Sequence, residues 1–170
     1  MKSLTTLRLV LLKKISQKKT SSGLFIGREK EKWRRLENER DVRSVAKNFF
    51  SFDMLNPASL DPSNQVLSFN HADIVFAVAG GANPTVMFCK PGTIVIELIP
   101  PNFRGDWGMR IWCALLNLNY WRVTGEYSDH HVNLGSLPID RDFGISLEYF
   151  RKTMDSVSEN LSELYLERIY

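Results

Sequence analysis

The residues with the clearest potential for chemistry form a glycine-rich loop, Ala79-Gly80-Gly81-Ala82-Asn83-Pro84. The loop follows residues 73–78, an apolar run whose length is typical of a parallel strand covered on both faces. Adjacent glycines let the backbone approach a ligand closely, and Asn83 with Pro84 can open a helix whose free N–H groups favour an anion. Glycines at such a turn also serve tight packing alone. The loop therefore indicates either an anion site or a packed turn.

Two charged residues follow other predicted strands. Glu97 lies near the end of the apolar segment 93–98, where a carboxylate must find a donor or reach solvent. A ribose or sugar hydroxyl, a salt bridge and a helix cap are its candidate partners. Arg28 ends the short apolar segment 24–27.

Patterns for metal or nucleophilic chemistry are weaker. The Asp140-Arg141-Asp142 sequence looks like the Asp-x-Asp of metal-dependent transferases, but it precedes a predicted helix that carboxylates could cap. His130 and His131 are adjacent, so in an extended segment they point to opposite sides and make a poor chelating pair. The chain lacks a Gly-x-Ser-x-Gly sequence, a Gly-Lys-Ser/Thr loop and a Cys-x-x-Cys pair. We expect no metal and no cofactor.

The elements that must position these residues alternate between strand and helix. Strands are predicted at 24–27, 49–55, 73–78, 93–98 and 120–124. Helices are predicted at 38–48, from Pro62, in a short segment ending at Phe88, at 107–117, and in a long amphipathic closing segment from Leu147. This alternation predicts an α/β fold, a Rossmann-like parallel sheet with flanking helices whose strand carboxyl ends line the site.

The first 22 residues differ from the rest of the chain. Residues 1–35 hold eleven Lys/Arg and two Asp/Glu, whereas the whole 170-residue chain has a net charge of only +3. Apolar residues at helical spacing predict a basic amphipathic helix over residues 1–22, followed by one domain over residues 23–170. The helix could pack on the domain or a partner, or contact a membrane surface peripherally. Aromatic residues are not interleaved with its lysines, so we expect no nucleic-acid partner.

Composition says less about the compartment. Cys89 and Cys113 both lie among apolar neighbours, which suits buried free thiols better than a disulfide framework. The Asn160-Leu161-Ser162 glycosylation pattern lies in a predicted helix. We expect a cytoplasmic protein or one peripheral on a membrane, with the Golgi or endoplasmic reticulum lumen as the alternative for a eukaryotic chain.

Several spaced motifs resemble glycosyltransferase family 61. That family has a strand ending Ile-Ser-Arg, then Arg-Arg-x-x-Asn-Glu, a Glu-Gln, an Ala-Asp strand start and Phe-x-Pro-Pro-Gly-Thr-x-Val-Ile-Glu-Leu. The similar segments here are Phe25-Ile26-Gly27-Arg28, Arg34-Arg35-Leu36-Glu37-Asn38-Glu39, Gln65, Ala72-Asp73-Ile74-Val75 and residues 88–98. The resemblance runs from about residue 4 to residue 155.

The resemblance implies the C-terminal, donor-binding half of a GT-B glycosyltransferase that needs no metal. Such an enzyme transfers a sugar from a nucleotide sugar to a glycan or protein acceptor, and an N-terminal acceptor domain or partner chain would complete it. The donor-binding residues implied are Arg28, Gly80, Gly81, Ala82, Asn83, Pro84 and Glu97. No general base is identified. Ala79 stands where the family has a histidine, so the alternative is a truncated or degenerate domain that binds without catalysis.

Overall fold

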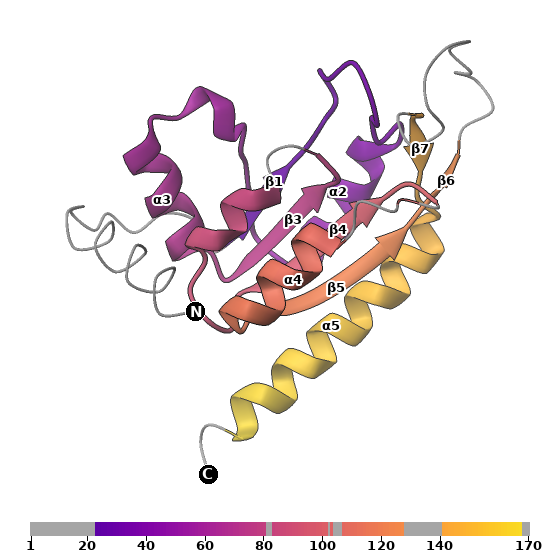
Figure 1. The fold of residues 1–170 in the computed structure, drawn as a ribbon. Helices are drawn as coiled ribbons and strands as arrows, with labels where there is room; N and C mark the ends of the chain where they lie inside the picture. Colours follow the sequence, from indigo (N-terminus) through magenta and orange to yellow (C-terminus); the bar gives the residue numbers. More distant parts are fainter. Residues whose placement is uncertain (1–22, 81–82, 102, 104–106, 128–140, 168–170) are drawn as a thin grey trace.

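The computed structural model describes residues 23–80, 83–101, 103, 107–127 and 141–167. Its centre is a sheet of five parallel strands in the order β2-β1-β3-β4-β5 (Figure 1). The strands are β1 (Gly23–Ile26), β2 (Asp53–Met54), β3 (Ile74–Val78), β4 (Ile94–Ile99) and β5 (Asn119–Thr124). The predicted α/β Rossmann-like sheet is therefore confirmed. The helix predicted within residues 1–22 lies outside the described residues.

The strand order contains a change of direction next to β1. The chain passes from β1 to β2 on one side, then crosses to β3 on the other side of β1 and continues outward through β4 to β5. Connections that leave neighbouring parallel strands in opposite directions open a crevice at the carboxyl ends of those strands, and this topological switch point is where open α/β sheets bind ligands. The fold thus directs attention to the ends of β1 and β3.

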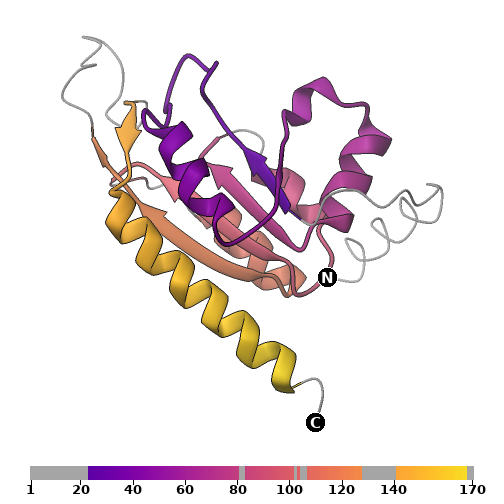
Figure 2. The same ribbon diagram turned by 180° about the vertical axis from the view of Figure 1, so that it is seen from behind.

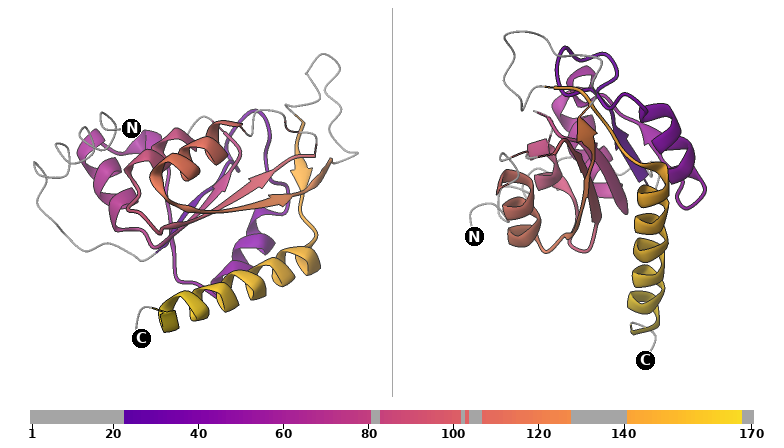
Figure 3. Two further views of the ribbon diagram at one scale, coloured as in Figure 1. Left: turned by 60° about the horizontal axis from the view of Figure 1, so that its bottom comes forward. Right: turned by 90° about the vertical axis from the view of Figure 1, so that its right-hand side faces the viewer.

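Helices cover both faces of the sheet, as Figures 2 and 3 show from behind and from the side. On one face lie α2 (Glu39–Lys47) and α5 (Leu147–Glu167), and on the other lie α3 (Pro62–His71), the 3-10 helix η2 (Asn83–Phe88) and α4 (Trp107–Leu116). Alternate residues of β3 serve the two cores: Phe76 packs with α2 and α5, whereas Val75 packs with α3 and α4. Because both faces are covered, every residue of β3 and β4 is buried.

Local sequence explains where α3 begins. Asp61 Oδ1 accepts the backbone N–H groups of Ser63 at 3.0 Å and Asn64 at 3.1 Å, and Pro62 occupies the first helical position. A capping side chain followed by proline favours the start of a helix, and the predicted start at Pro62 is confirmed. The two cysteines are free and buried, also as predicted.

The second predicted strand is wrong in extent. Residues 49–55 were expected to form it, but β2 comprises only Asp53 and Met54. Phe50 and Phe52 instead pack around Phe76, with ring centroids 6.2 and 5.4 Å away. The segment is apolar because it fills the core beneath the sheet edge rather than because it pairs along its length.

Three short elements were not predicted. The 3-10 helix η1 (Pro57–Ser59) precedes α3, and the antiparallel pair β6 (Glu126–Tyr127) and β7 (Phe143–Gly144) lies beyond the end of β5. Among the residues that the structure describes, no helix is long and apolar enough to cross a membrane.

Candidate functional site

A pocket of about 430 Å³ lies at the carboxyl ends of β1 and β3, the switch point of the sheet. Three parts of the chain enclose it: the end of β1 with the loop that follows, the η1 turn with α3, and the end of β3 with η2. The lining residues are Ile26, Gly27, Arg28, Glu31, Asn56, Pro57, Ala58, Gln65, Val78, Gly80 and Thr85. Arg28 and Gly80, both predicted as site residues, are thus brought together.

Arg28 is the cationic side chain of this lining. Its Nε and Nη2 donate to the Trp33 carbonyl oxygen at 3.2 and 2.9 Å, and Nη2 lies 3.9 Å from the Glu31 carboxylate. The Arg28 side chain is 14% exposed, whereas that of Glu31 is 57% exposed. A partly desolvated guanidinium held on a carbonyl is oriented before any ligand arrives, and its attraction for an anion is screened less than at the open surface.

Gly80 makes room for that guanidinium. A Cβ atom at Gly80 would lie against Nη1 of Arg28, 3.0 Å from its Cζ and 3.2 Å from its Cδ. Among the described glycines only Gly92 has a positive φ, so Gly80 is not required for a left-handed backbone. The reason for glycine here is space. Gly80 was expected to let a ligand approach the backbone closely. In the structure the group that approaches it is the Arg28 side chain.

Glu39 supports the same corner; it ends the Arg34-Arg35-Leu36-Glu37-Asn38-Glu39 motif, but no role at the site was predicted for it. Although it begins α2, it is only 2% exposed, and its Oε2 accepts the backbone N–H of Arg28 at 2.8 Å. Burial raises the pKa of the Glu39 carboxyl, against the opposing effects of the Arg28 N–H and the Arg43 guanidinium. Glu39 shares one helix face with the buried Val42 and Ala46. A carboxylate on an otherwise apolar helix face was the signal that could have revealed it.

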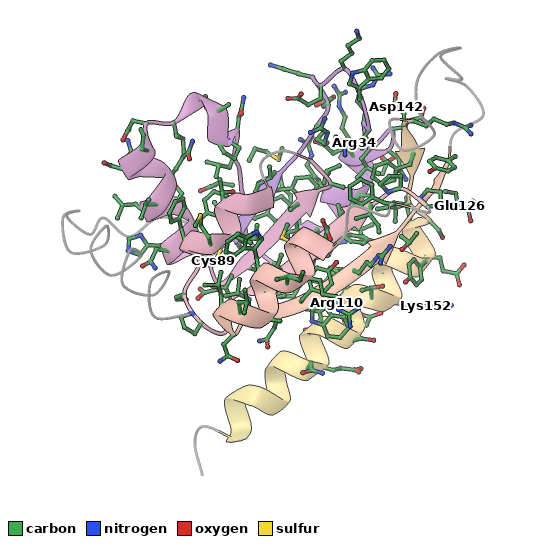
Figure 4. All side chains as sticks on the ribbon, in the orientation of Figure 1. Arg34, Cys89, Arg110, Glu126, Asp142 and Lys152 are labelled. Atoms are coloured by element: carbon green, nitrogen blue, oxygen red, sulfur yellow. The ribbon has the colours of Figure 1, made fainter. Side chains whose placement is uncertain are left out.

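Two long-range links hold the loop between β1 and α2. Arg35 donates to Asp142 through its backbone N at 2.7 Å and its Nε at 2.8 Å. Asn38 donates to the Ile145 carbonyl oxygen at 2.7 Å and accepts the Ile145 N–H at 3.1 Å. Figure 4 shows Asp142 beside β7, at the same end of the sheet as the loop that carries Arg34.

These links correct the interpretation of the Asp-x-Asp sequence. Asp142 was expected to cap the closing helix rather than to bind a metal, but it is the ion-pair partner of Arg35. Asp140, His130 and His131 lie outside the described residues. Within the part of the chain that the structure describes, no group of three or more His, Cys, Asp or Glu side chains is placed to hold a metal ion.

The model of the family described as Glycosyltransferase 61 matches residues 2–96. This chain belongs to glycosyltransferase family 61. The match covers every segment that lines the pocket, from β1 to η2. Membership supports a general role in glycosyl transfer, with a sugar donor and an acceptor as substrates. No curated protein matches the chain.

Ala79 is the residue at which the glycine-rich loop departs from the family 61 motif. Ala79 stands where the family 61 motif has a histidine, and its side chain is fully buried beside Ile99 and Phe103. Its backbone N–H donates to the Leu98 carbonyl oxygen at 2.9 Å, so the position continues the line of β3. Ala79 does not line the pocket.

Glu97, the other family 61 residue predicted to bind the donor, lies away from this pocket. It is 1% exposed and does not line the pocket. Its Oε2 accepts the hydroxyl of Tyr120 at 2.6 Å, on the face of the sheet that α4 covers. Burial raises the pKa of Tyr120, and the hydrogen bond to Glu97 adds to that rise. The Glu97 carboxylate therefore has a donor within the protein.

The remaining predicted donor residues follow β3 in the sequence. Gly81 and Ala82 lie outside the described residues, and Asn83 with Pro84 begins η2. The helix predicted to end at Phe88 is therefore present as a 3-10 helix that starts at Asn83, at the end of the glycine-rich loop.

Proposed function

We propose that this family 61 domain binds the diphosphate of a nucleotide-sugar donor at the ends of β1 and β3 and takes part in transferring the sugar to a glycan or protein acceptor. The observation that supports it is the pocket at the switch point, where a partly buried Arg28 lies against Gly80. The size of the pocket falls within the range of small-molecule sites, about 300 to 1,000 Å³.

The charges around Arg28 suit a ligand that arrives with its own anion. Glu31 is an acidic side chain of the pocket lining; it is more than half exposed, and its carboxylate lies 3.9 Å from the guanidinium. A contact this long to an exposed carboxylate is weak, so a phosphate can displace Glu31 at little cost. A charge-assisted bond from Arg28 to a phosphate oxygen would then be worth about 1.5 to 3 kcal/mol.

The opposite wall would recognise the less charged part of the donor. Gln65 Nε2 donates to the Pro57 carbonyl oxygen, and Asn56 Oδ1 accepts the Ala58 N–H at 3.1 Å. These bonds fix the η1 turn in front of the pocket, so its shape is set before the ligand binds. A preformed polar wall of this kind suits a ribose, a base or the transferred sugar.

In this proposal the arginine, rather than a metal ion, balances the diphosphate charge. A GT-B partner domain or a second chain would bring the acceptor and the general base that deprotonates its hydroxyl. We place the domain in the secretory lumen, where members of the family generally work. The basic segment at residues 1–22 would contact a partner or a membrane surface.

A donor-binding domain without catalysis is the second candidate. The observation that favours it is Ala79, whose methyl group offers no hydrogen-bond donor where the family motif has an imidazole. Binding and catalysis separate because proximity and orientation of both substrates can supply roughly 7 to 11 kcal/mol of a barrier, which a single binding site does not provide.

The test is a thermal-shift screen of UDP-, GDP-, CMP- and dTDP-sugars, followed by calorimetry and by mass spectrometry with a mixed acceptor pool. A ligand at 100 times its Kd should stabilise the folded state by about 2.7 kcal/mol. Binding of one class of nucleotide sugar supports the proposal, and product formation would decide between the two candidates. If no nucleotide sugar shifts the transition, the donor site is refuted.

A further inference from the structure

Glu39 is a buried charge that glycosyl transfer does not by itself explain. Its side chain leaves the first turn of α2 and runs to the end of β1, below the pocket rather than into it. Burying a carboxylate is costly unless donors surround it. Glu39 therefore places a carboxylate, at a cost in stability, where an apolar residue would match its neighbours Val42 and Ala46.

Gly27 provides the space for this carboxylate. A Cβ atom at Gly27 would fall on Oε1 of Glu39, 2.7 Å from its Cδ and 2.8 Å from its Oε2. Gly27 itself does not have a positive φ, so it also serves here for space. Two glycines therefore flank the same arginine: Gly27 admits the carboxylate beneath the Arg28 backbone, and Gly80 admits the guanidinium above it.

The two carboxylate oxygens have separate partners. Oε2 accepts the Arg28 N–H at 2.8 Å, and Oε1 lies 3.6 Å from Nη1 of Arg43, one helical turn further along α2. Arg28 is in turn held at both ends, with its backbone on Glu39 and its guanidinium on the Trp33 carbonyl oxygen. A long side chain fixed at its root and at its tip loses most of its rotational freedom before a ligand binds.

We propose that Glu39 is a positioning residue that holds Arg28 in the orientation needed to bind the ligand's phosphate. It acts through the Arg28 backbone and does not touch the ligand. The inference rests on the proposed function, because it assigns the anion to Arg28. It predicts that loss of Glu39 weakens anion binding only where Arg28 is present to be positioned.

A double-mutant cycle with inorganic pyrophosphate tests this, because pyrophosphate reports on the anion site whatever the base or sugar. Glu39→Met has a similar volume and no acceptor, whereas Glu39→Gln keeps one oxygen for the Arg28 N–H. We expect Glu39→Met to weaken pyrophosphate binding about five- to tenfold and Glu39→Gln to recover most of that loss. Asp41→Asn removes an exposed charge from the same helical turn and should change affinity less than about twofold.

The Arg28→Gln variant shows whether Glu39 positions Arg28 or only supports the fold. In an Arg28→Gln protein, Glu39→Met should have no further effect on pyrophosphate affinity. An equal loss with and without Arg28 would overturn the inference, as would unchanged affinity of Glu39→Met in the wild-type background. Far-ultraviolet circular dichroism at the titration temperature establishes that each variant is folded.

A readout without ligand separates this inference from the donor proposal. In a nitrogen-15 spectrum, the Arg28 Nε–H should give a protected signal in the wild type and in Asp41→Asn, and lose that protection in Glu39→Met. If no anion binds the wild type while this pattern holds, the donor proposal fails and the positioning role stands. If the signal is the same in all three proteins, the positioning role fails.

Discussion

Two carboxylates of this domain are almost equally buried, and they do different things. Glu39 is 2% exposed and accepts a backbone N–H at the edge of the pocket, whereas Glu97 is 1% exposed and accepts the Tyr120 hydroxyl within the layer beneath α4. Burial alone therefore does not mark a ligand-binding carboxylate. The group from which each oxygen accepts determines whether its loss should reach the pocket or only the stability of the fold.

The largest effect is expected from filling the space over which Arg28 lies. Gly80→Val would place a branched side chain on the guanidinium and displace it from the pocket. We expect nucleotide-sugar affinity to fall at least about 100-fold, which is roughly 2.7 kcal/mol. Calorimetry measures this, with Gly108→Val as the control, because a Cβ at Gly108 meets nothing within 4 Å. Retained affinity would remove the end of β3 from the site.

Removing the cation itself should come next. Arg28→Gln is expected to weaken nucleotide-sugar binding by about 1.5 to 3 kcal/mol, because a charge-assisted bond to phosphate is lost. The loss of the bonds to Trp33 should cost about 1 kcal/mol of stability. Arg40→Gln, which removes an 80% exposed arginine of the neighbouring helix, should leave both quantities nearly unchanged. Equal affinity of Arg28→Gln and the wild type would mean that Arg28 is purely structural.

Loss of the hydrogen bond between Tyr120 and Glu97 should change stability alone. Tyr120→Phe removes the hydroxyl that donates to Glu97, which is expected to lower the free energy of unfolding by about 1 to 3 kcal/mol. Donor affinity should be unchanged. Urea unfolding and calorimetry on the same preparation check both, with the exposed Tyr149→Phe as the matched control. A loss of affinity without a loss of stability would return Glu97 to the binding site.

The smallest effect is confined to alkaline pH. Burial, together with the Glu97 charge, raises the pKa of the Cys113 thiol from 9.0 to about 12. The unfolded thiol therefore ionises first, so stability should be complete below pH 9 and decline as the pH rises from 9 towards 12. Cys113→Ala should make that decline shallower in thermal melts across this range. An identical pH profile for the two proteins would show that Cys113 does not contribute.

Much of the scaffold could be predicted because its local signals agree with its tertiary role. Strands 74–78 and 94–99 lie within one residue of the predicted 73–78 and 93–98, since a strand covered on both faces must be continuously apolar. The strand predicted at 49–55 was too long because its apolar residues suggested a buried strand. They form an aromatic cluster around Phe76 instead. Apolar runs of this length do not distinguish the two uses.

The candidate site was only half predictable. The family resemblance placed Arg28 and Gly80 in it, and the structure brings them together. Glu97 was predicted to bind the donor, and no sequence pattern reveals that Tyr120, 23 residues away, donates to its carboxylate. No site role was predicted for Glu39, because an acidic residue is common at the start of a helix. There it normally faces solvent and interacts with the helix dipole.

The link between Arg35 and Asp142 has a consequence for the order in which the protein acquires its parts. The two residues are separated by 107 positions, as are Asn38 and Ile145. During synthesis the amino-terminal segments emerge first, so β1 through β5 can pair before Asp142 has left the ribosome. Contacts between such distant segments are slow to form because a long loop must close first. The loop that carries Arg28 should therefore be the last part of the pocket to become ordered. A nascent chain that ends before β7 should have the complete five-stranded sheet but no ordered anion site.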